Sequence, residues 1–138
     1  MSSDEHLRHA ALTWTHGLVF EGGAPNGPSI TLDGDSTEGP SPMVALLLAA
    51  AACMGADVVS ILDKMRAGLT GCRIEVTGTR RADHPKRYTA MRFGFRMSGS
   101  ALDEAKARRA VGLSLEKYCS VVHSLAPDIV VSHDVTLG

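Results

Sequence analysis

Residues 41–66, SPMVALLLAAAACMGADVVSILDKMR, decide the fold that this chain can adopt. Ser41 is a favourable helix cap, and Pro42 suits the first helical position, where a backbone N–H is not needed. Every residue from Met43 to Met54 is apolar, so the first half of the helix presents apolar side chains in all directions. Such a helix must be surrounded by protein. The uninterrupted apolar run is shorter than the about 20 residues that cross a bilayer, so we expect a buried central helix and no membrane span.

Length and composition predict one cytoplasmic domain. The 138 residues suffice for a core, and we expect a single domain over residues 1–138. The net charge is −1 and there is no basic run, which argues against nucleic acid and membrane surfaces as partners. The chain has three cysteines and an N-terminus without the pattern of a signal peptide, which indicates reduced thiols in the cytoplasm.

The sequence around the helix predicts six short strands and a second helix. Runs rich in β-prone residues precede the first helix at 10–15, 18–21 and 29–33, and apolar alternation follows it at 72–77, 91–97 and 129–137. A helical period returns from Ala101 and places one stripe of residues on a common face: Ala107, Ala110, Val111, Ser114 and Tyr118.

The predicted order, βββ–α–ββ–α–β, is typical of an α+β fold with mostly antiparallel sheets that wrap the long central helix. One small sheet covers only one side of a helix that is apolar all round. We therefore expect a second copy of the chain to cover the other side, which makes the protein a homodimer.

Two thiols stand out by position. Cys53 lies in the middle of the central helix, and Cys119 lies near the end of the next one. A free cysteine is most often an inert, buried side chain, and spacing alone favours that interpretation. A metal site is not indicated, because no CxxC or HxxxH pair occurs. His123 follows Cys119 by four residues and could face it on a helical turn.

Three segments resemble the OsmC/Ohr family, and most closely its less characterised OsmC-like branch. They are residues 41–66 as quoted above, 76–93 (VTGTRRADHPKRYTAMRF) and 113–121 (LSLEKYCSV), and the similarity extends over about residues 10–137. The resemblance implies an OsmC-like fold. In that fold, two long helices lie back to back in an intertwined homodimer, enclosed by sheets from both chains.

The resemblance also implies a chemistry. The family's first cysteine attacks an organic hydroperoxide and its second resolves the product as a disulfide, and these positions match Cys53 and Cys119. The implied function is a thiol-dependent hydroperoxide reductase in oxidative-stress defence. It would use a dithiol reductant of lipoyl type and would need no metal and no organic cofactor. Cys72 matches neither position, and we interpret it as a packing residue.

One position departs from the family pattern. The characterised peroxidases activate the first thiol with an Arg–Glu pair whose Glu follows the helix-start proline, and Met43 stands there in this chain. The activating cation is therefore expected elsewhere, among Arg80, Arg81 and Lys117. Asp57 either binds that cation or ends the apolar half of the helix at a solvent-exposed edge. The departure leaves a second function open, a non-peroxidatic OsmC-like dimer that binds a small apolar ligand or acts as a thiol redox switch.

Overall fold

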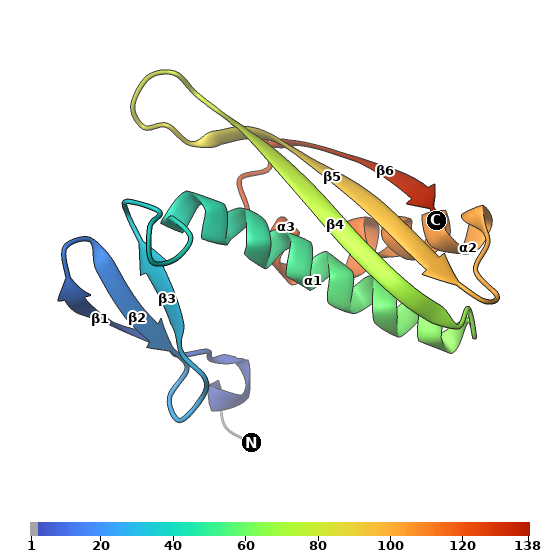
Figure 1. The fold of residues 1–138 in the computed structure, drawn as a ribbon, viewed down its shortest axis with the longest axis horizontal. Helices are drawn as coiled ribbons and strands as arrows, with labels where there is room; N and C mark the ends of the chain where they lie inside the picture. Colours follow the sequence, from blue (N-terminus) through green and yellow to red (C-terminus); the bar gives the residue numbers. More distant parts are fainter. Residues whose placement is uncertain (1–2) are drawn as a thin grey trace. The chain divides into compact units, whose positions relative to one another are not determined.

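The computed structural model describes residues 3–138, and their side chains from Glu5 onward. A short 3₁₀ helix, η1 (Ser3–His6), is followed by strands β1 (Ala11–His16), β2 (Val19–Gly23) and β3 (Ile30–Asp33), and by helix α1 (Pro42–Lys64). Strands β4 (Leu69–Arg80) and β5 (Tyr88–Gly99) come next, and then α2 (Glu104–Leu113), a π-helical turn η2 (Ser114–Tyr118), α3 (Ser120–His123) and β6 (Val130–Leu137) (Figure 1). The α+β class and the order of the main elements are confirmed.

The chain forms two compact units, one up to Leu46 and the other from Leu47 to Gly138. The first unit contains an antiparallel sheet with the strand order β1–β2–β3. Large apolar side chains of this sheet are exposed, among them Leu12, Trp14 and Ile30, at 56%, 62% and 60%. This unit therefore does not bury its own apolar surface.

Asp33, the last residue of β3, organises the polar segment that leads to α1. Its side chain is buried, and its carboxylate accepts hydrogen bonds from the backbone N–H groups of Asp35 at 2.8 Å, Thr37 at 3.2 Å and Glu38 at 3.0 Å. The bonds from Glu38 and Asp35 hold the pKa of Asp33 below its usual value. The carboxylate therefore stabilises the fold in its ionised form.

We expect the substitution Asp33→Asn to lower stability at neutral pH, because an amide is neutral and offers one acceptor oxygen where the carboxylate offers two. A group whose pKa is lowered by folding contributes stability above its unfolded pKa and loses it as the pH falls through the folded value. The difference in urea midpoint between the natural protein and Asp33→Asn should therefore shrink below about pH 4. The exposed neighbour Asp35→Asn is the control, and a pH-independent difference for Asp33→Asn would contradict the assignment.

Helix α1 begins as predicted and ends two residues earlier than the stretch suggested. The hydroxyl of Ser41 accepts a hydrogen bond from the N–H of Val44 at 3.2 Å, which is the expected cap. One face of the helix is buried, and it consists of Leu47, Ala50, Ala51, Met54, Val58 and Leu62. Val44, Leu48 and Val59 are 44–51% exposed. The single chain thus covers α1 on one side only.

As a whole, α1 is long enough and apolar enough to cross a membrane, with a mean hydropathy of 2.2 over its most apolar window. Its uninterrupted apolar run, Met43 to Met54, is too short to do so. The core helix of a soluble protein meets the same criteria. The buried face of α1, together with the charged residues Asp57 and Asp63 in its second half, is typical of a core helix.

The second unit contains a sheet with the order β4–β5–β6. In the central strand β5, Met91, Phe93, Phe95 and Met97 are at most 1% exposed, and α1 and α2 lie along this face of the sheet (Figure 1). Two glycines allow α1 and β4 to approach closely. A Cβ on Gly55 would lie 3.0 Å from Cδ1 of Ile74. One on Gly78 would lie 2.4 Å from Cε1 of Tyr88 and 3.0 Å from Cδ2 of Leu47.

The sheet is mixed, since β4 pairs with β5 antiparallel but β6 pairs with β5 parallel. The prediction of mostly antiparallel sheets is confirmed, since the pairings β1–β2, β2–β3 and β4–β5 are antiparallel, and the parallel pairing of β6 is the exception. A parallel pair needs a crossover of about a dozen residues or more, which is usually helical. Here α2, η2 and α3 provide it between Gly99 and Val130.

Candidate functional site

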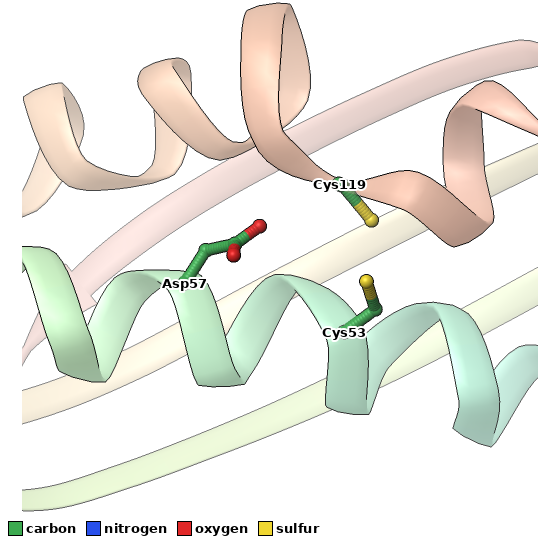
Figure 2. A group of neighbouring side chains, drawn as sticks. All are labelled: Cys53, Asp57 and Cys119. Carbon is green, nitrogen blue, oxygen red and sulfur yellow. The ribbon is translucent and has the colours of Figure 1, made fainter. Parts of the chain in front are cut away.

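Three side chains from distant parts of the sequence meet in the second unit. The sulfur atoms of Cys53 and Cys119 and a carboxylate oxygen of Asp57 all lie within 4.8 Å of one another. Figure 2 shows the sulfur of Cys119 directed at the sulfur of Cys53, with the carboxylate of Asp57 beside them. We call this group the thiol–carboxylate cluster.

Helix α1 supplies two members of the cluster. Cys53 and Asp57 are four residues apart, and side chains at this spacing are neighbours on one helix face. Both are partly exposed, whereas Met54 and Val58, one position further along, belong to the buried face. The cluster therefore lies at the edge of the core, and Cys53 is partly accessible to solvent.

The third member, Cys119, is positioned by a π-helical turn. The helical period predicted from Ala101 is confirmed for Ala107, Ala110, Val111 and Ser114, all of which are fully buried. It is wrong for Tyr118, which is 49% exposed. Turn η2 widens the helix after Ser114, which shifts the register so that Cys119 turns inward in place of Tyr118. Cys119 is fully buried and has extended backbone angles.

Ser114 connects the turn to the central helix, and the sequence analysis missed this role. Its buried hydroxyl donates a hydrogen bond to Oδ2 of Asp57 at 2.9 Å. The backbone carbonyl of Ser114 also accepts a hydrogen bond from the N–H of Cys119 at 2.7 Å. A polar residue on a predicted buried stripe was the available signal, since a buried hydroxyl needs a partner. Asp57 therefore has a defined partner in Ser114.

The environment of Cys119 keeps it protonated. Burial, the largest cause, raises its pKa to about 11. The N–H of Val122 lowers it, while the hydrogen bond with Cys53 and the negative charges of Cys53 and Asp57 raise it further. At neutral pH Cys119 is a neutral thiol beside a partly exposed Cys53.

The other residues that the sequence suggested have different surroundings. Nε2 of His123 donates to the carbonyl oxygen of Leu115 at 2.9 Å, which ties α3 to the π-helical turn. Nζ of Lys117 lies 5.3 Å from the centre of the Tyr118 ring. Arg80 donates to the carbonyl oxygen of Lys86 at 2.6 Å. Arg81 and Cys72 are exposed, so Cys72 does not pack in the core of the single chain.

A groove of about 380 Å³ opens beside the cluster, and Asp57 lines it. Its walls combine apolar side chains from α1, α2 and the following turns with two cationic side chains. The apolar ones are Ile61, Met65, Leu113 and Tyr118, and the cationic ones are Lys64 and Arg109. Lys64 and Arg109 were not among the cations that the sequence analysis considered. Asp57 is the member of the cluster that lines this groove.

Comparison with known proteins agrees with this fold. The profile of the OsmC-like protein family matches residues 33–134. Protein YhfA of Escherichia coli (strain K12) is 40% identical over 125 residues, which is 90% of this chain and 93% of YhfA. The chain therefore belongs to the OsmC-like protein family, and the resemblance seen in the sequence is confirmed.

Solved structures share the fold. A hypothetical protein from Aquifex aeolicus VF5 is 30% identical with a TM-score of 0.82, and the match covers 96% of this chain and 98% of that one. The organic hydroperoxide resistance protein OhrB of Bacillus subtilis is 16% identical with a TM-score of 0.63, covering 93% and 98%. At 16% identity, the similarity to OhrB shows a shared fold alone.

We expect Asp57→Asn to lower the pKa of Cys119 below about 11, because the negative charge of Asp57 contributes to the rise. The fall should be partial, since burial, the largest cause, is unchanged. Titration of the Cys119 ¹³Cβ chemical shift by NMR measures the change. Asp63→Asn, an exposed carboxylate later on the same helix, is the control. An unchanged titration in Asp57→Asn, or an equal fall in Asp63→Asn, would refute this electrostatic contact.

Proposed function

We propose that this protein is a thiol-dependent reductase of organic hydroperoxides that acts in oxidative-stress defence. The observation that carries the proposal is the proximity of Cys53 and Cys119, whose sulfur atoms lie within 4.8 Å of each other. Membership of the OsmC-like family and the fold shared with an organic hydroperoxide resistance protein support it. Two thiols at this distance can form a disulfide after a small side-chain rotation, which is what a two-cysteine peroxidase requires.

The accessibility of the two thiols assigns their roles in this proposal. Cys53 is partly exposed and meets the peroxide, whereas Cys119 is buried and protonated. The Cys53 thiolate attacks the O–O bond of ROOH, takes up the terminal OH as sulfenic acid and releases the alcohol ROH after protonation. The Cys119 sulfur then attacks the sulfenic sulfur, which forms the disulfide and releases water. A dithiol of lipoyl type reduces the disulfide by exchange and is itself oxidised.

The groove beside Asp57 supports an organic peroxide as the substrate. Ile61, Met65 and Leu113 offer apolar surface to a hydrocarbon chain, which gains about 0.8 kcal/mol for each methylene that leaves water. Hydrogen peroxide has no such chain and gains nothing from these walls. The groove thus favours a substrate with an apolar tail.

We expect an alkyl hydroperoxide to be reduced with a higher kcat/KM than hydrogen peroxide. Three or four buried methylenes correspond to roughly 2–3 kcal/mol, or about 30- to 150-fold, if the contacts persist in the transition state. Peroxide consumption with a dithiol reductant measures both rates. Cys53→Ser should abolish turnover, and Cys119→Ser should stop after one oxidation with sulfenic acid on Cys53.

The exposed Cys72→Ser variant is the matched control and should keep full turnover. Turnover that survives in Cys53→Ser would refute the mechanism, and equal rates for both peroxides would refute the role of the groove. Disulfide formation without catalytic turnover would favour the second function, a thiol redox switch, which the Met43 departure left open.

We also propose that the protein is a cytoplasmic homodimer. In the first unit, Leu12, Trp14 and Ile30 expose apolar surface, and in the second unit Leu48 and Val59 do the same on α1. Exposed apolar surface of this extent is typical of an interface. A second copy of the chain, related by two-fold symmetry, would bury these surfaces in both copies.

Sedimentation at micromolar concentration should give about 29 kDa, which is twice the 14.6 kDa of one chain. Leu48→Glu should dissociate the dimer, because a charge would replace an apolar contact between copies. Lys86→Glu, at another exposed position in the connection between β4 and β5, should leave the mass unchanged. A folded monomer of the natural protein at this concentration would contradict the proposal.

A further inference from the structure

We propose that the thiol–carboxylate cluster binds a thiophilic divalent cation such as Zn²⁺, with Cys53, Asp57 and Cys119 as its three protein ligands. This inference goes beyond the proposed function and does not depend on it, because it concerns binding to the reduced protein. It rests on the convergence of three ligand-type atoms within 4.8 Å of one another. It reverses the expectation of no metal, which rested on the absence of short-range ligand motifs.

The distances fit a tetrahedral site. Zn–S bonds of about 2.3 Å and Zn–O bonds of about 2.1 Å place the ligand atoms of such a site roughly 3.6–3.8 Å apart. The three atoms are already within 4.8 Å, so small rotations about the side-chain bonds of Cys53 and Asp57 bring them to these separations. Three protein ligands leave the fourth position open for water or another small ligand, as in catalytic rather than structural zinc sites.

The surroundings of the ligands also suit a cation. Ser114 donates to Oδ2 of Asp57 and so orients the carboxylate, which is the usual arrangement around a metal ligand. Asp57 lines the groove and Cys53 is partly exposed, so an ion can reach these two ligands from solvent. Two sulfur ligands and one oxygen ligand select thiophilic ions over Mg²⁺ and Ca²⁺, which prefer oxygen.

The charges balance in a simple exchange. A divalent cation that binds both sulfur atoms as thiolates displaces the two thiol protons, and no oxidant or reductant takes part. Cys119 is protonated at neutral pH, so the loss of its proton costs free energy when a metal ion binds. A coordinating metal ion offsets that cost because it removes the repulsion among three groups that would otherwise be negatively charged together.

A cation in the cluster would occupy the sulfur atoms that the proposed peroxidase reaction needs. Metal binding and disulfide formation are therefore mutually exclusive, because each needs the sulfur atoms of both Cys53 and Cys119. The bound ion would shield the pair from oxidation and alkylation while it remained in place.

The first test titrates the reduced full-length protein with Co²⁺ and follows its absorption spectrum, with Zn²⁺ equilibrium dialysis for stoichiometry. We expect one ion per chain, the strong visible bands of tetrahedral Co²⁺ and a sulfur-to-cobalt charge-transfer band. Cys53→Ser and Cys119→Ser should lose the charge-transfer band or weaken it, and Cys72→Ser should leave the spectrum and the affinity unchanged.

Asp57→Asn and Ser114→Ala should each lower the affinity by about 10- to 100-fold, with Asp63→Asn as the matched control. No bound ion would overturn the proposal. So would a weak octahedral spectrum without the sulfur band, which would indicate a surface site at the histidines. Binding that survives in both Cys53→Ser and Cys119→Ser would overturn it as well.

A second measurement needs no variant. In the natural protein, Zn²⁺ should slow the alkylation of Cys53 by iodoacetamide at least about tenfold while Cys72 reacts at the same rate, as mapped by mass spectrometry of the peptides. Mg²⁺ should slow neither. Equal rates at Cys53 with and without Zn²⁺ would refute the site. Neither test uses a peroxide, so the metal site and the proposed reductase can each fail while the other stands.

Discussion

Helix α1 lies so close to strand β4 at Gly55 that Ile74 occupies the space where a side chain on this residue would begin. This close packing fixes the rotation of α1 about its own axis. Leu47, Met54 and Val58 are therefore buried, and Cys53 and Asp57 lie at the edge of the core, where they meet Cys119. The placement of the cluster thus follows from which face of α1 packs on the sheet.

The π-helical turn completes the cluster from the opposite side. In a regular α-helix the stripe that buries Ala107, Ala110 and Ser114 would continue to Tyr118. The wider turn moves Tyr118 to the surface and brings Cys119 to the core instead. The hydrogen bond from Ser114 to Asp57 then holds this turn against α1. The result is two thiols and a carboxylate within 4.8 Å of one another, and we propose disulfide formation and the binding of a soft cation as its two uses.

The sequence predicts the local parts of this structure well. The bounds of α1 agree within two residues, the Ser41 cap is present, and the order of the main elements is correct, because cap residues and hydrophobic period act over a few positions. The parallel pairing of β6 with β5 depends on the path of a long crossover, which no local pattern records. The order strand, helix, strand at the end of the chain was the signal that could have predicted it.

The candidate site is less accessible to sequence reasoning. Spacing favoured inert packing for Cys53 and Cys119, and only the family resemblance joined them. Ser114 and Arg109 were missed, since their relation to Asp57 exists only when α2 and η2 pack beside α1. Lys64 was also missed, although it follows Asp57 by seven residues on α1 and this spacing places both on one helix face. The catalytic roles of Cys53 and Cys119, and those of Lys117 and His123 as supporting residues, stay predictions.

We propose that Cys53 and Cys119 act as a redox pair and that Cys72 does not. The most direct measurement adds one equivalent of an organic hydroperoxide to the reduced protein, blocks the free thiols under denaturing conditions and maps the cysteine peptides by mass spectrometry. We expect a Cys53–Cys119 disulfide within one chain, with Cys72 recovered as the alkylated thiol. A dominant disulfide that contains Cys72, or a Cys53 that stays reduced, would contradict it.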